Sequence, residues 1–190
     1  MNSSRIPPAV YGDRAKPTGP EPVRRAVAAR AIVAVADVTQ NNLGQVRKLN
    51  SALFPIAYTD KVYTDLLHDD VRQLCKLGLF NDIPAGDICC RLEDGSDPTK
   101  VKVYIMTLGV LPPYRRLGIA SALLRHVVDH VGIGSLVSGR RVESIYLHVQ
   151  TGNEAARQFY EAFGFSIVDT VPQYYRELVP PSAWVLAKTA

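Results

Sequence analysis

The most constraining feature of this sequence is a single strand–turn–helix–strand unit between residues 101 and 150. Val101–Val110 and Ser144–Gln150 alternate as β-strands, and the apolar residues of 119–131 recur at helical spacing. A strand, a helix and a second strand joined in this way form a right-handed crossover, in which the two strands run parallel or nearly so. The unit therefore predicts an α/β fold built around a parallel strand pair.

Antiparallel strands are predicted before this unit, because 74–80 and 86–92 alternate as a hairpin across 81–85 and a further turn at 94–98 leads into Val101. An earlier strand at 31–36 is followed by a helix with apolar residues at Leu43, Val46, Leu49 and Leu53, and a short helix is expected from residue 59 or 60 to about 68. After Gln150, Thr151 and Glu154 have capping-box spacing before a helix that Gly164 closes. Two more strands are expected near 165–170 and 183–187.

The chain of 190 residues fits one domain with a tail. We assign 31–190 to the folded domain and 1–30 to a flexible, Pro-containing extension, whose six basic and two acidic groups account for the whole net charge of +4. The extension is either a solubilising tail or a contact for a polyanion such as RNA, and we favour the first interpretation.

Cysteine usage and hydropathy exclude several classes of protein. Cys75, Cys89 and Cys90 form an odd set without zinc-ligand spacing, which favours a reduced intracellular setting and no metal site. No apolar stretch approaches the roughly 20 residues that a membrane-spanning helix needs, so we expect no membrane insertion.

The turn before the central helix has the chemistry of an anion site. Arg115 and Arg116 supply positive charge, and the unpaired N–H groups of the first helical turn can receive a pyrophosphate. Gly118 lets such a group approach the main chain. The turn has neither the Gly-Lys-Ser/Thr ending of a Walker loop nor a Gly-x-Gly-x-x-Gly fingerprint. Taken alone, the same residues would also suit an ordinary exposed turn.

The segment Arg115–Ala120 resembles the Gln/Arg-x-x-Gly-x-Gly/Ala acetyl-coenzyme A motif of the GNAT acetyltransferases, and it lies between a strand and a helix as in that family. Strings elsewhere are similar to the NatE-type protein N-terminal acetyltransferases. They are Phe54-Pro55, 80–83, 104–109, 113–119, 145–150, 153–155, 159–160 and Tyr174-Tyr175. The resemblance covers about Ala31 to the C-terminus and leaves residues 1–30 unexplained.

The resemblance implies a GNAT fold: a mixed central sheet, with antiparallel N-terminal strands and a splayed parallel strand pair, flanked by helices. Acetyl-CoA would enter from one side of the splay as the cosubstrate, and a peptide N-terminus from the other. The residues expected to bind the coenzyme are Leu108, Gly109, Val110, Arg115, Arg116, Leu117, Gly118, Ile119, Ala120, Asn153 and Tyr160. Tyr160 would protonate the leaving thiolate or only pack in the core, and Asn153 would contact the coenzyme or only cap a helix.

Tyr104 and His148 are the predicted catalytic pair. Tyr104 and Met106 share one face of their strand, while His148 lies on a face of the neighbouring strand with Tyr146 and Gln150, so a Tyr and a His can meet across the splay. A histidine has a pKa suited to removing a proton, and in the resembled family the equivalent pair acts through a water. No Asp or Glu occurs in 104–110 to serve as a base. Without the coenzyme motif, a structural role for His148 would be the commoner interpretation.

Substrate recognition is expected from two loops that the core pattern does not need. Their apolar and aromatic side chains, together with Met106, would form a pocket for a Met side chain and its neighbour. The expected substrate-binding residues are Phe54, Pro55, Ile56, Tyr58, Met106, Tyr174 and Tyr175. The alternative is a loop that only covers the edge of the core.

The resemblance implies transfer of acetyl to the α-amine of protein N-termini, with a retained Met and a hydrophobic or varied second residue. The expected partners are nascent or free N-termini, the NatA complex and the ribosome, in the cytoplasm and also the nucleus. Two alternatives remain open. The chain could be a catalytically weak acetyl-CoA-binding subunit that docks a ribosome-associated complex, or a lysine ε-acetyltransferase.

Overall fold

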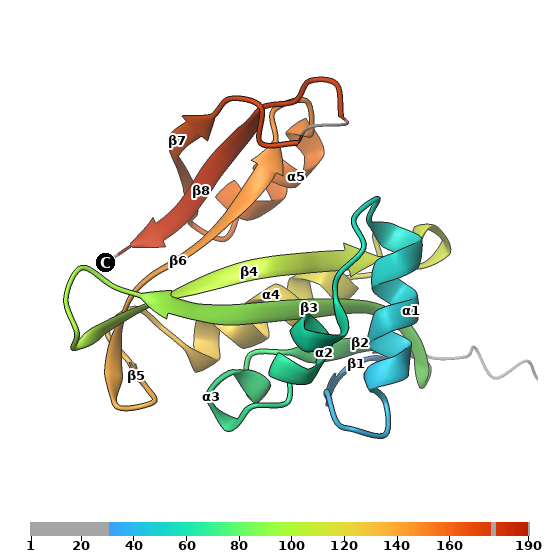
Figure 1. Cartoon of the computed structure of the whole chain (residues 1–190). Helices are drawn as coiled ribbons and strands as arrows, with labels where there is room; N and C mark the ends of the chain where they lie inside the picture. Colours follow the sequence, from blue (N-terminus) through green and yellow to red (C-terminus); the bar gives the residue numbers. More distant parts are fainter. Residues whose placement is uncertain (1–30, 176–177, 190) are drawn as a thin grey trace, which may run out of the picture. The chain divides into compact units, whose positions relative to one another are not determined.

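The computed structural model describes residues 31–175 and 178–189. The predicted extension at 1–30 lies outside these residues. The described strands form one sheet in the order β1-β2-β3-β4-β6-β8-β7, and a short β5 pairs with β6 (Figure 1). The strand bounds are β1 Val33–Asp37, β2 Lys76–Phe80, β3 Ile83–Asp94, β4 Lys100–Val110, β5 Leu136–Val137, β6 Arg140–Gln150, β7 Ser166–Val171 and β8 Ala183–Thr189.

The strands β1, β2, β3 and β4 pair with one another in succession, and each of these three pairs is antiparallel, as the sequence predicts. The β2–β3 hairpin is tighter than the predicted five-residue loop, because Phe80 pairs with Ile83 and only Asn81 and Asp82 remain in the turn. Both turn residues have positive φ, 47° and 65°, a conformation that Asn and Asp tolerate and that matches the twist of a hairpin.

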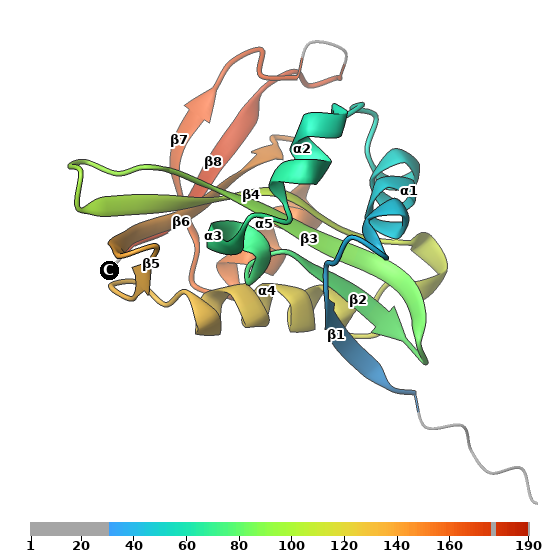
Figure 2. The same ribbon diagram turned by 60° about the horizontal axis from the view of Figure 1, so that its bottom comes forward.

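Helices cover both faces of these strands. α1 (Leu43–Leu53), α2 (Asp60–Asp65) and α3 (Asp69–Arg72) lie on one face, and α4 (Ile119–His130) lies across the other (Figures 1 and 2). The short helix predicted to about residue 68 is α2, which already ends at Asp65, and the short helix α3 that follows it was not predicted. α4 buries its apolar stripe, Ile119, Leu123, Leu124 and Val127, against the sheet.

β4 and β6 run parallel from Lys100↔Arg141 to Tyr104↔Tyr146, where their pairing ends. Beyond this point the two central strands diverge, while the other edge of β6 is paired with β8 from Ser144 to Gln150 (Figure 1). The predicted parallel crossover and splay are therefore confirmed. β4 also carries a bulge, since Cys89 pairs with Thr107 and Cys90 with Ile105, which leaves Met106 without a partner. The alternation of side chains shifts by one residue at this bulge.

Because β4 and β6 diverge, the sheet has two arms: the first consists of β1 to β4, and the second consists of β6, β8 and β7. The C-terminal elements complete the second arm. β6 begins at Arg140, earlier than predicted, and α5 spans Glu154–Glu161. The cap of α5 differs from the predicted capping box, because the Asn153 side chain, not Thr151, accepts from the Ala156 N–H at 3.1 Å. The Thr151 hydroxyl instead bonds the Ser182 hydroxyl at 2.8 Å.

Within the described ranges, no helix combines the length and the apolar character that crossing a bilayer requires.

Gly86 marks a close backbone approach between β3 and β4. A Cβ at this position would overlap the Gly109 carbonyl oxygen, whereas a Cβ at Gly44 in α1 would meet no atom within 4 Å. We expect Gly86→Ala to cost about 1–3 kcal/mol by overpacking. Gly44→Ala should be neutral or stabilising by up to about 1 kcal/mol, because Ala is the better helix former. Urea unfolding of both variants checks this, and equal stabilities would contradict the close approach.

Candidate active site

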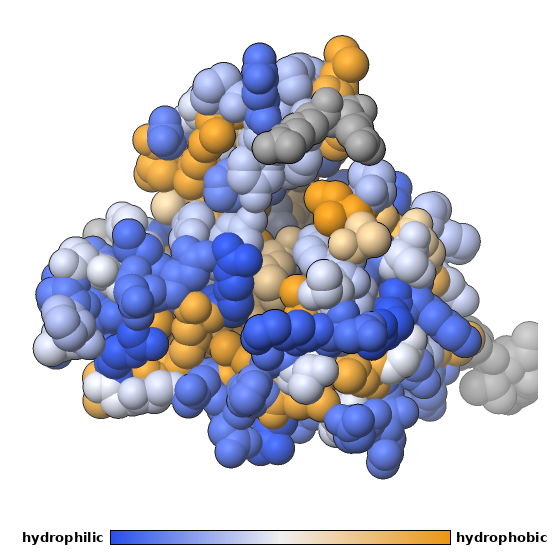
Figure 3. All heavy atoms as spheres, in the orientation of Figure 1, coloured by the Kyte–Doolittle hydropathy of each residue, from blue (hydrophilic) through white to orange (hydrophobic). Residues whose placement is uncertain are grey.

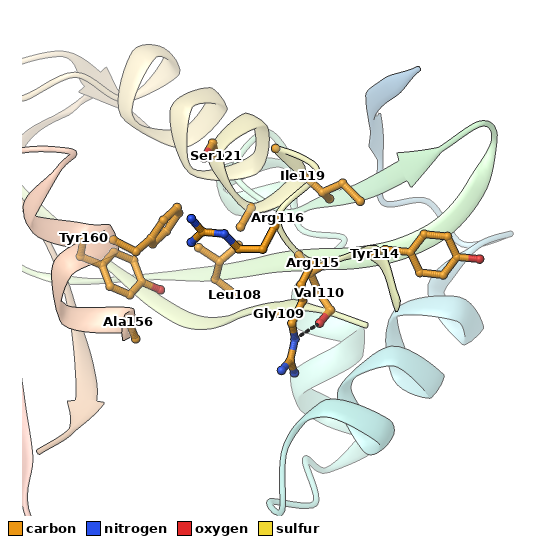
Figure 4. A pocket seen from close by; sticks show the side chains of 13 residues that line it. Leu108, Gly109, Val110, Tyr114, Arg115, Arg116, Ile119, Ser121, Ala156 and Tyr160 are labelled. Carbon is orange, nitrogen blue, oxygen red and sulfur yellow. Dashed lines mark hydrogen bonds between the residues drawn. The ribbon is translucent and has the colours of Figure 1, made fainter. Parts of the chain in front are cut away.

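Two cavities adjoin where β4 and β6 separate. The larger, about 470 Å³, lies between the end of β4, the turn before α4, and α5 (Figure 4). The smaller, about 240 Å³, lies between the segment after α1, β4, β6 and the segment after β7. Leu108, Ala156 and Tyr160 line both cavities. Figure 3 shows this face of the molecule hollowed between the two arms of the sheet.

The larger cavity is bordered by the N-terminus of α4. The first intrahelical bond runs from the Ala122 N–H to the Gly118 carbonyl, so the three preceding amides have no partner within the helix. Gly118 has φ +88°, and a Cβ there would meet no atom within 4 Å, so its main chain is open to a ligand. Arg116 extends across the cavity towards Tyr160, whereas Arg115 turns away and donates to the Val110 carbonyl at 3.0 Å (Figure 4).

Most of the predicted coenzyme residues line this larger cavity: Leu108, Gly109, Val110, Arg115, Arg116, Gly118, Ile119, Ala120 and Tyr160. Leu117 does not, and its side chain is 43% exposed. Asn153 lines the smaller cavity and caps α5. Tyr160 is 7% exposed, and burial raises the pKa of its phenol. Sequence reasoning missed Tyr114, Ser121, Ala156 and Phe159, which complete the lining.

Tyr104 and His148 meet across the splay, as predicted. The Tyr104 hydroxyl lies 3.2 Å from His148 Nδ1. Burial lowers the pKa of His148, which favours a neutral imidazole that can accept a proton. Burial, together with a hydrogen bond to Tyr174, raises the pKa of Tyr104, so its phenol stays protonated. The pair thus consists of a neutral base and a neutral hydroxyl.

Tyr174 lies directly on this pair and does not line either cavity. Its ring stacks on His148 with centroids 4.1 Å apart and planes 8° apart, and its hydroxyl lies 3.0 Å from that of Tyr104. The neighbouring Tyr175 lines the smaller cavity, and its hydroxyl donates to the His148 carbonyl at 3.5 Å. Burial raises the pKa of Tyr175 to about 12.

The other predicted substrate residues, Phe54, Pro55, Ile56, Tyr58 and Met106, line the smaller cavity. Phe54 also packs over Gly109 of β4, so this segment covers part of the sheet and forms a cavity wall at the same time. Tyr58 packs edge-on against Tyr63, and burial raises the pKa of Tyr58 to about 12. Ile105, Thr107, Leu147, Val149, Gln150 and Leu178 are lining residues that sequence reasoning missed.

An ionic group around Tyr104 was also missed. The Arg91 guanidinium lies 4.5 Å above the Tyr104 ring and donates to Glu93 at 2.8 and 2.5 Å. Glu93 also accepts from the Tyr146 hydroxyl, and the Tyr146 ring lies 4.9 Å from that of Tyr104. Burial opposes ionisation of Glu93, but the bonds from Tyr146 and Arg91 outweigh it and lower the pKa of the carboxyl. Arg91 reaches Tyr104 through the Arg91↔Tyr104 register of β3 and β4, which no motif in the sequence marks.

This arrangement suits the joining of two ligands. One cavity offers free amides and arginines to an anionic ligand, and the other offers apolar and aromatic walls. The neutral base and the hydroxyl lie at the place where the cavities adjoin. Such a site can deprotonate a nucleophile from one cavity as it attacks a group held in the other.

Comparison with known proteins agrees with this geometry. The family model described as "Acetyltransferase (GNAT) family" matches residues 43–165. The probable N-acetyltransferase san of Drosophila melanogaster is 42% identical over 160 residues, which cover 84% of this chain and 82% of the fly protein. N-alpha-acetyltransferase 50 of the zebrafish Danio rerio is 43% identical over 157 residues, 83% of this chain and 88% of its own.

Solved structures are similar as well. Arabidopsis thaliana Naa50 in complex with the bisubstrate analogue CoA-Ac-MVNAL is 44% identical, with a TM-score of 0.72, and the match covers 83% of this chain and 99% of that one. Arabidopsis thaliana NAA60 in complex with acetyl-CoA is 21% identical, with a TM-score of 0.69, and the match covers 84% of this chain and 100% of that one. At this identity the similarity shows the shared fold.

The electrostatics of His148 can be measured directly. We expect the imidazole of His148 to titrate below the unperturbed pKa of about 6.5. Glu93→Gln should lower that pKa further, because the negative charge of Glu93 favours the imidazolium. Glu143→Gln, which removes a partly exposed carboxylate of the same sheet, is the matched control and should leave the pKa of His148 unchanged. NMR titration decides this, and a higher pKa in Glu93→Gln would contradict the assigned field.

Proposed function

Because the chain belongs to the acetyltransferase (GNAT) family, we propose that it transfers the acetyl group of acetyl-CoA to the α-amine of protein N-termini. The observation that carries the proposal is the Tyr104–His148 contact of 3.2 Å at the place where the two cavities adjoin. The 42–43% identity to relatives named as N-acetyltransferases supports the same reaction.

The larger cavity fits acetyl-CoA. The free amides at the start of α4 and the guanidinium of Arg116 suit the pyrophosphate, and the open main chain at Gly118 leaves room for it. The cavity continues past Leu108 to Tyr160, where a long acyl-bearing arm can reach the splay. When bound, acetyl-CoA supplies a thioester carbonyl that an amine can attack.

The residues of the chain then remove one proton from the amine and supply one to the leaving thiolate. A C–N bond forms as the thioester C–S bond breaks, and the amine must lose a proton while the thiolate gains one. His148, neutral because burial lowers its pKa, accepts the amine proton directly or through a water that the Tyr104 hydroxyl holds. Tyr160, whose pKa burial raises, keeps its proton and can donate it to the leaving thiolate.

The pKa values of the two candidate amines indicate which of them accepts the acetyl group. A peptide α-amine has a pKa of about 7.7–8.0 and a lysine amine one of about 10.4, so at pH 7.5 roughly a third of the former and about 0.1% of the latter are neutral. A neutral imidazole is a modest base and suits the α-amine far better. We therefore favour α-amine transfer over lysine ε-acetylation.

The proposed peptide begins with a retained Met, followed by a hydrophobic or varied residue. Phe54, Ile56 and Met106 offer apolar surface to the Met side chain, and Tyr58 and Tyr175, which line the same cavity, carry hydroxyls that can bond the peptide backbone. Tyr174, on the catalytic pair, would contact the same peptide.

The remaining proposals follow the resemblance of the sequence to NatE-type enzymes. Residues 31–190 are the acetyltransferase domain, and 1–30 are an extension that serves solubility or contacts RNA. Nascent or free N-termini are the substrates, the NatA complex and the ribosome are the docking partners, and the cytoplasm and nucleus are the locations.

Gly118→Glu tests the pyrophosphate site. The added carboxylate would occupy and repel the pyrophosphate, so we expect the Kd for acetyl-CoA to rise at least about 100-fold. Gly134→Glu is the matched control, because Gly134 also has positive φ, +87°, and open space around it, but it does not line the cavity. Calorimetry on both folded variants measures this, and equal affinities would refute the assigned site.

A peptide panel tests the reaction itself. Peptides beginning Met-Leu and containing internal lysines should be acetylated at the α-amine with kcat/KM at least about tenfold above Ser- or Asp-starting peptides, a difference that one filled apolar pocket can supply. Tyr58→Ala and Tyr175→Ala should each raise the KM for the Met-Leu peptide and so narrow its advantage in kcat/KM over the Ser- and Asp-starting peptides. Mass spectrometry of the products locates the acetyl group.

Each alternative has its own outcome in this panel. Preferential lysine modification would replace the α-amine proposal with ε-acetylation. Tight acetyl-CoA binding without turnover of any peptide would favour a weak, docking subunit. Equal rates on Met-Leu and Asp starts would contradict the assigned peptide cavity.

A further inference from the structure

Asp87 on β3 is a buried carboxyl that the reaction does not use. Its side chain is 0% exposed. Oδ2 accepts from the Thr107 hydroxyl at 3.2 Å and from the Cys89 thiol at 3.4 Å, while Oδ1 has no partner. No Lys, Arg or His of the described residues forms a salt bridge or hydrogen bond with it. A buried carboxylate without a cation is costly, so the neutral acid is the favoured form.

A second unpartnered oxygen belongs to the same cluster. Asn50, 2% exposed in the last turn of α1, donates through Nδ2 to Cys89 Sγ at 3.9 Å, and its Oδ1 has no partner. The chain of contacts therefore runs from Asn50 through Cys89 to Asp87. A protonated Asp87 carries one O–H donor, which is what a cluster with two unpartnered acceptors needs.

This cluster lies directly behind the smaller cavity. Thr107, bonded to Asp87, lines that cavity on β4. The carbonyl of Asn50 accepts the Phe54 N–H at 3.0 Å, and Phe54 begins the cavity wall after α1. The contacts of Asp87 thus connect two sides of the cavity, the floor on β4 and the wall after α1.

We propose that Asp87 is a positioning residue for the peptide: as a neutral acid it holds the floor and the wall of the smaller cavity together from behind, and loss of its proton loosens both. The inference rests on the proposed function only for the identity of the peptide. Ionisation would place an unpaired charge in this cluster, and the structure must open to hydrate it.

The groups that face Asp87 give its charge no compensation. Cys89 lies on the same strand, Cys75 faces Asp87 from the residue before β2, Tyr63 from α2, and the neutral Asn50 and Thr107 from α1 and β4. Burial raises the pKa of Asp87 to about 7 and also raises that of both thiols and of Tyr63. The loosening is therefore expected as pH passes through about 7.

Asp87→Asn keeps the size and removes the titration, and Asp94→Asn is an exposed control on the same strand. The test compares two ratios of parent to Asp87→Asn, one for the peptide KM and one for kcat. We expect the KM ratio to rise at least about threefold between pH 6 and pH 8.5 and the kcat ratio to stay constant. Because the peptide amine titrates equally with both proteins, its effect cancels in the KM ratio. Asp94→Asn should follow the parent. A ratio that stays flat with pH would overturn the proposal.

Two readouts do not need activity. Because the folded pKa is raised from about 3.9, protonation stabilises the fold fully at low pH, and this contribution is lost as pH rises to about 7. The Tm of the parent relative to Asp87→Asn should therefore fall from pH 4.5 to pH 7.5 and then level. Above pH 7, the Phe54 amide should exchange faster in the parent than in Asp87→Asn. If neither the Tm difference nor the exchange difference is seen, the proposal for Asp87 is overturned, whether or not a peptide is acetylated. Failure to acetylate any peptide would refute the proposed function, which is a separate result.

Discussion

The end of pairing between β4 and β6 at Tyr104↔Tyr146 is the constraint on which the rest of this site depends. Paired strands leave no space between them, whereas separated strands leave backbone groups and side chains facing a gap that a ligand can fill. β6 can leave β4 without losing its place in the sheet, because its other edge stays paired with β8 from Ser144 to Gln150. Both cavities, and the contact between Tyr104 and His148, lie where β6 separates from β4.

Burial, more than the charges nearby, sets the protonation states of the groups inside the gap. Desolvation lowers the pKa of His148 and raises the pKa values of Tyr104 and Tyr160, so all three groups are neutral near pH 7. A neutral imidazole accepts a proton and a neutral phenol can give one. The ionic group of Arg91 and Glu93 lies beside Tyr104 and holds its ring, while Asp87 lies behind the cavity floor.

Sequence alone predicts most of the element order, though not α3 or β5, and the parallel crossover, because these depend on periodicity within one short window. It also predicts that Tyr104 and His148 meet, from the parity of two neighbouring strands. It misses Arg91, Glu93 and Asp87, since their importance comes from register across strands. The bulge at Met106 also shifts the alternation, so parity counted from Tyr104 fails to bring Thr107 to the cavity. Asn153, not the Thr151–Glu154 pattern, caps α5, because the Thr151 hydroxyl bonds Ser182 across the arm instead.

The central claim is that Tyr104 and His148 act as one unit in proton removal. A double-variant cycle of Tyr104→Phe and His148→Ala on a Met-Leu peptide, at saturating acetyl-CoA, tests it most directly. The account predicts that each change lowers kcat by roughly 10- to 10⁴-fold with acetyl-CoA affinity unchanged, and that the double variant loses less than the product of the two. Near-parental kcat in both single variants would contradict it.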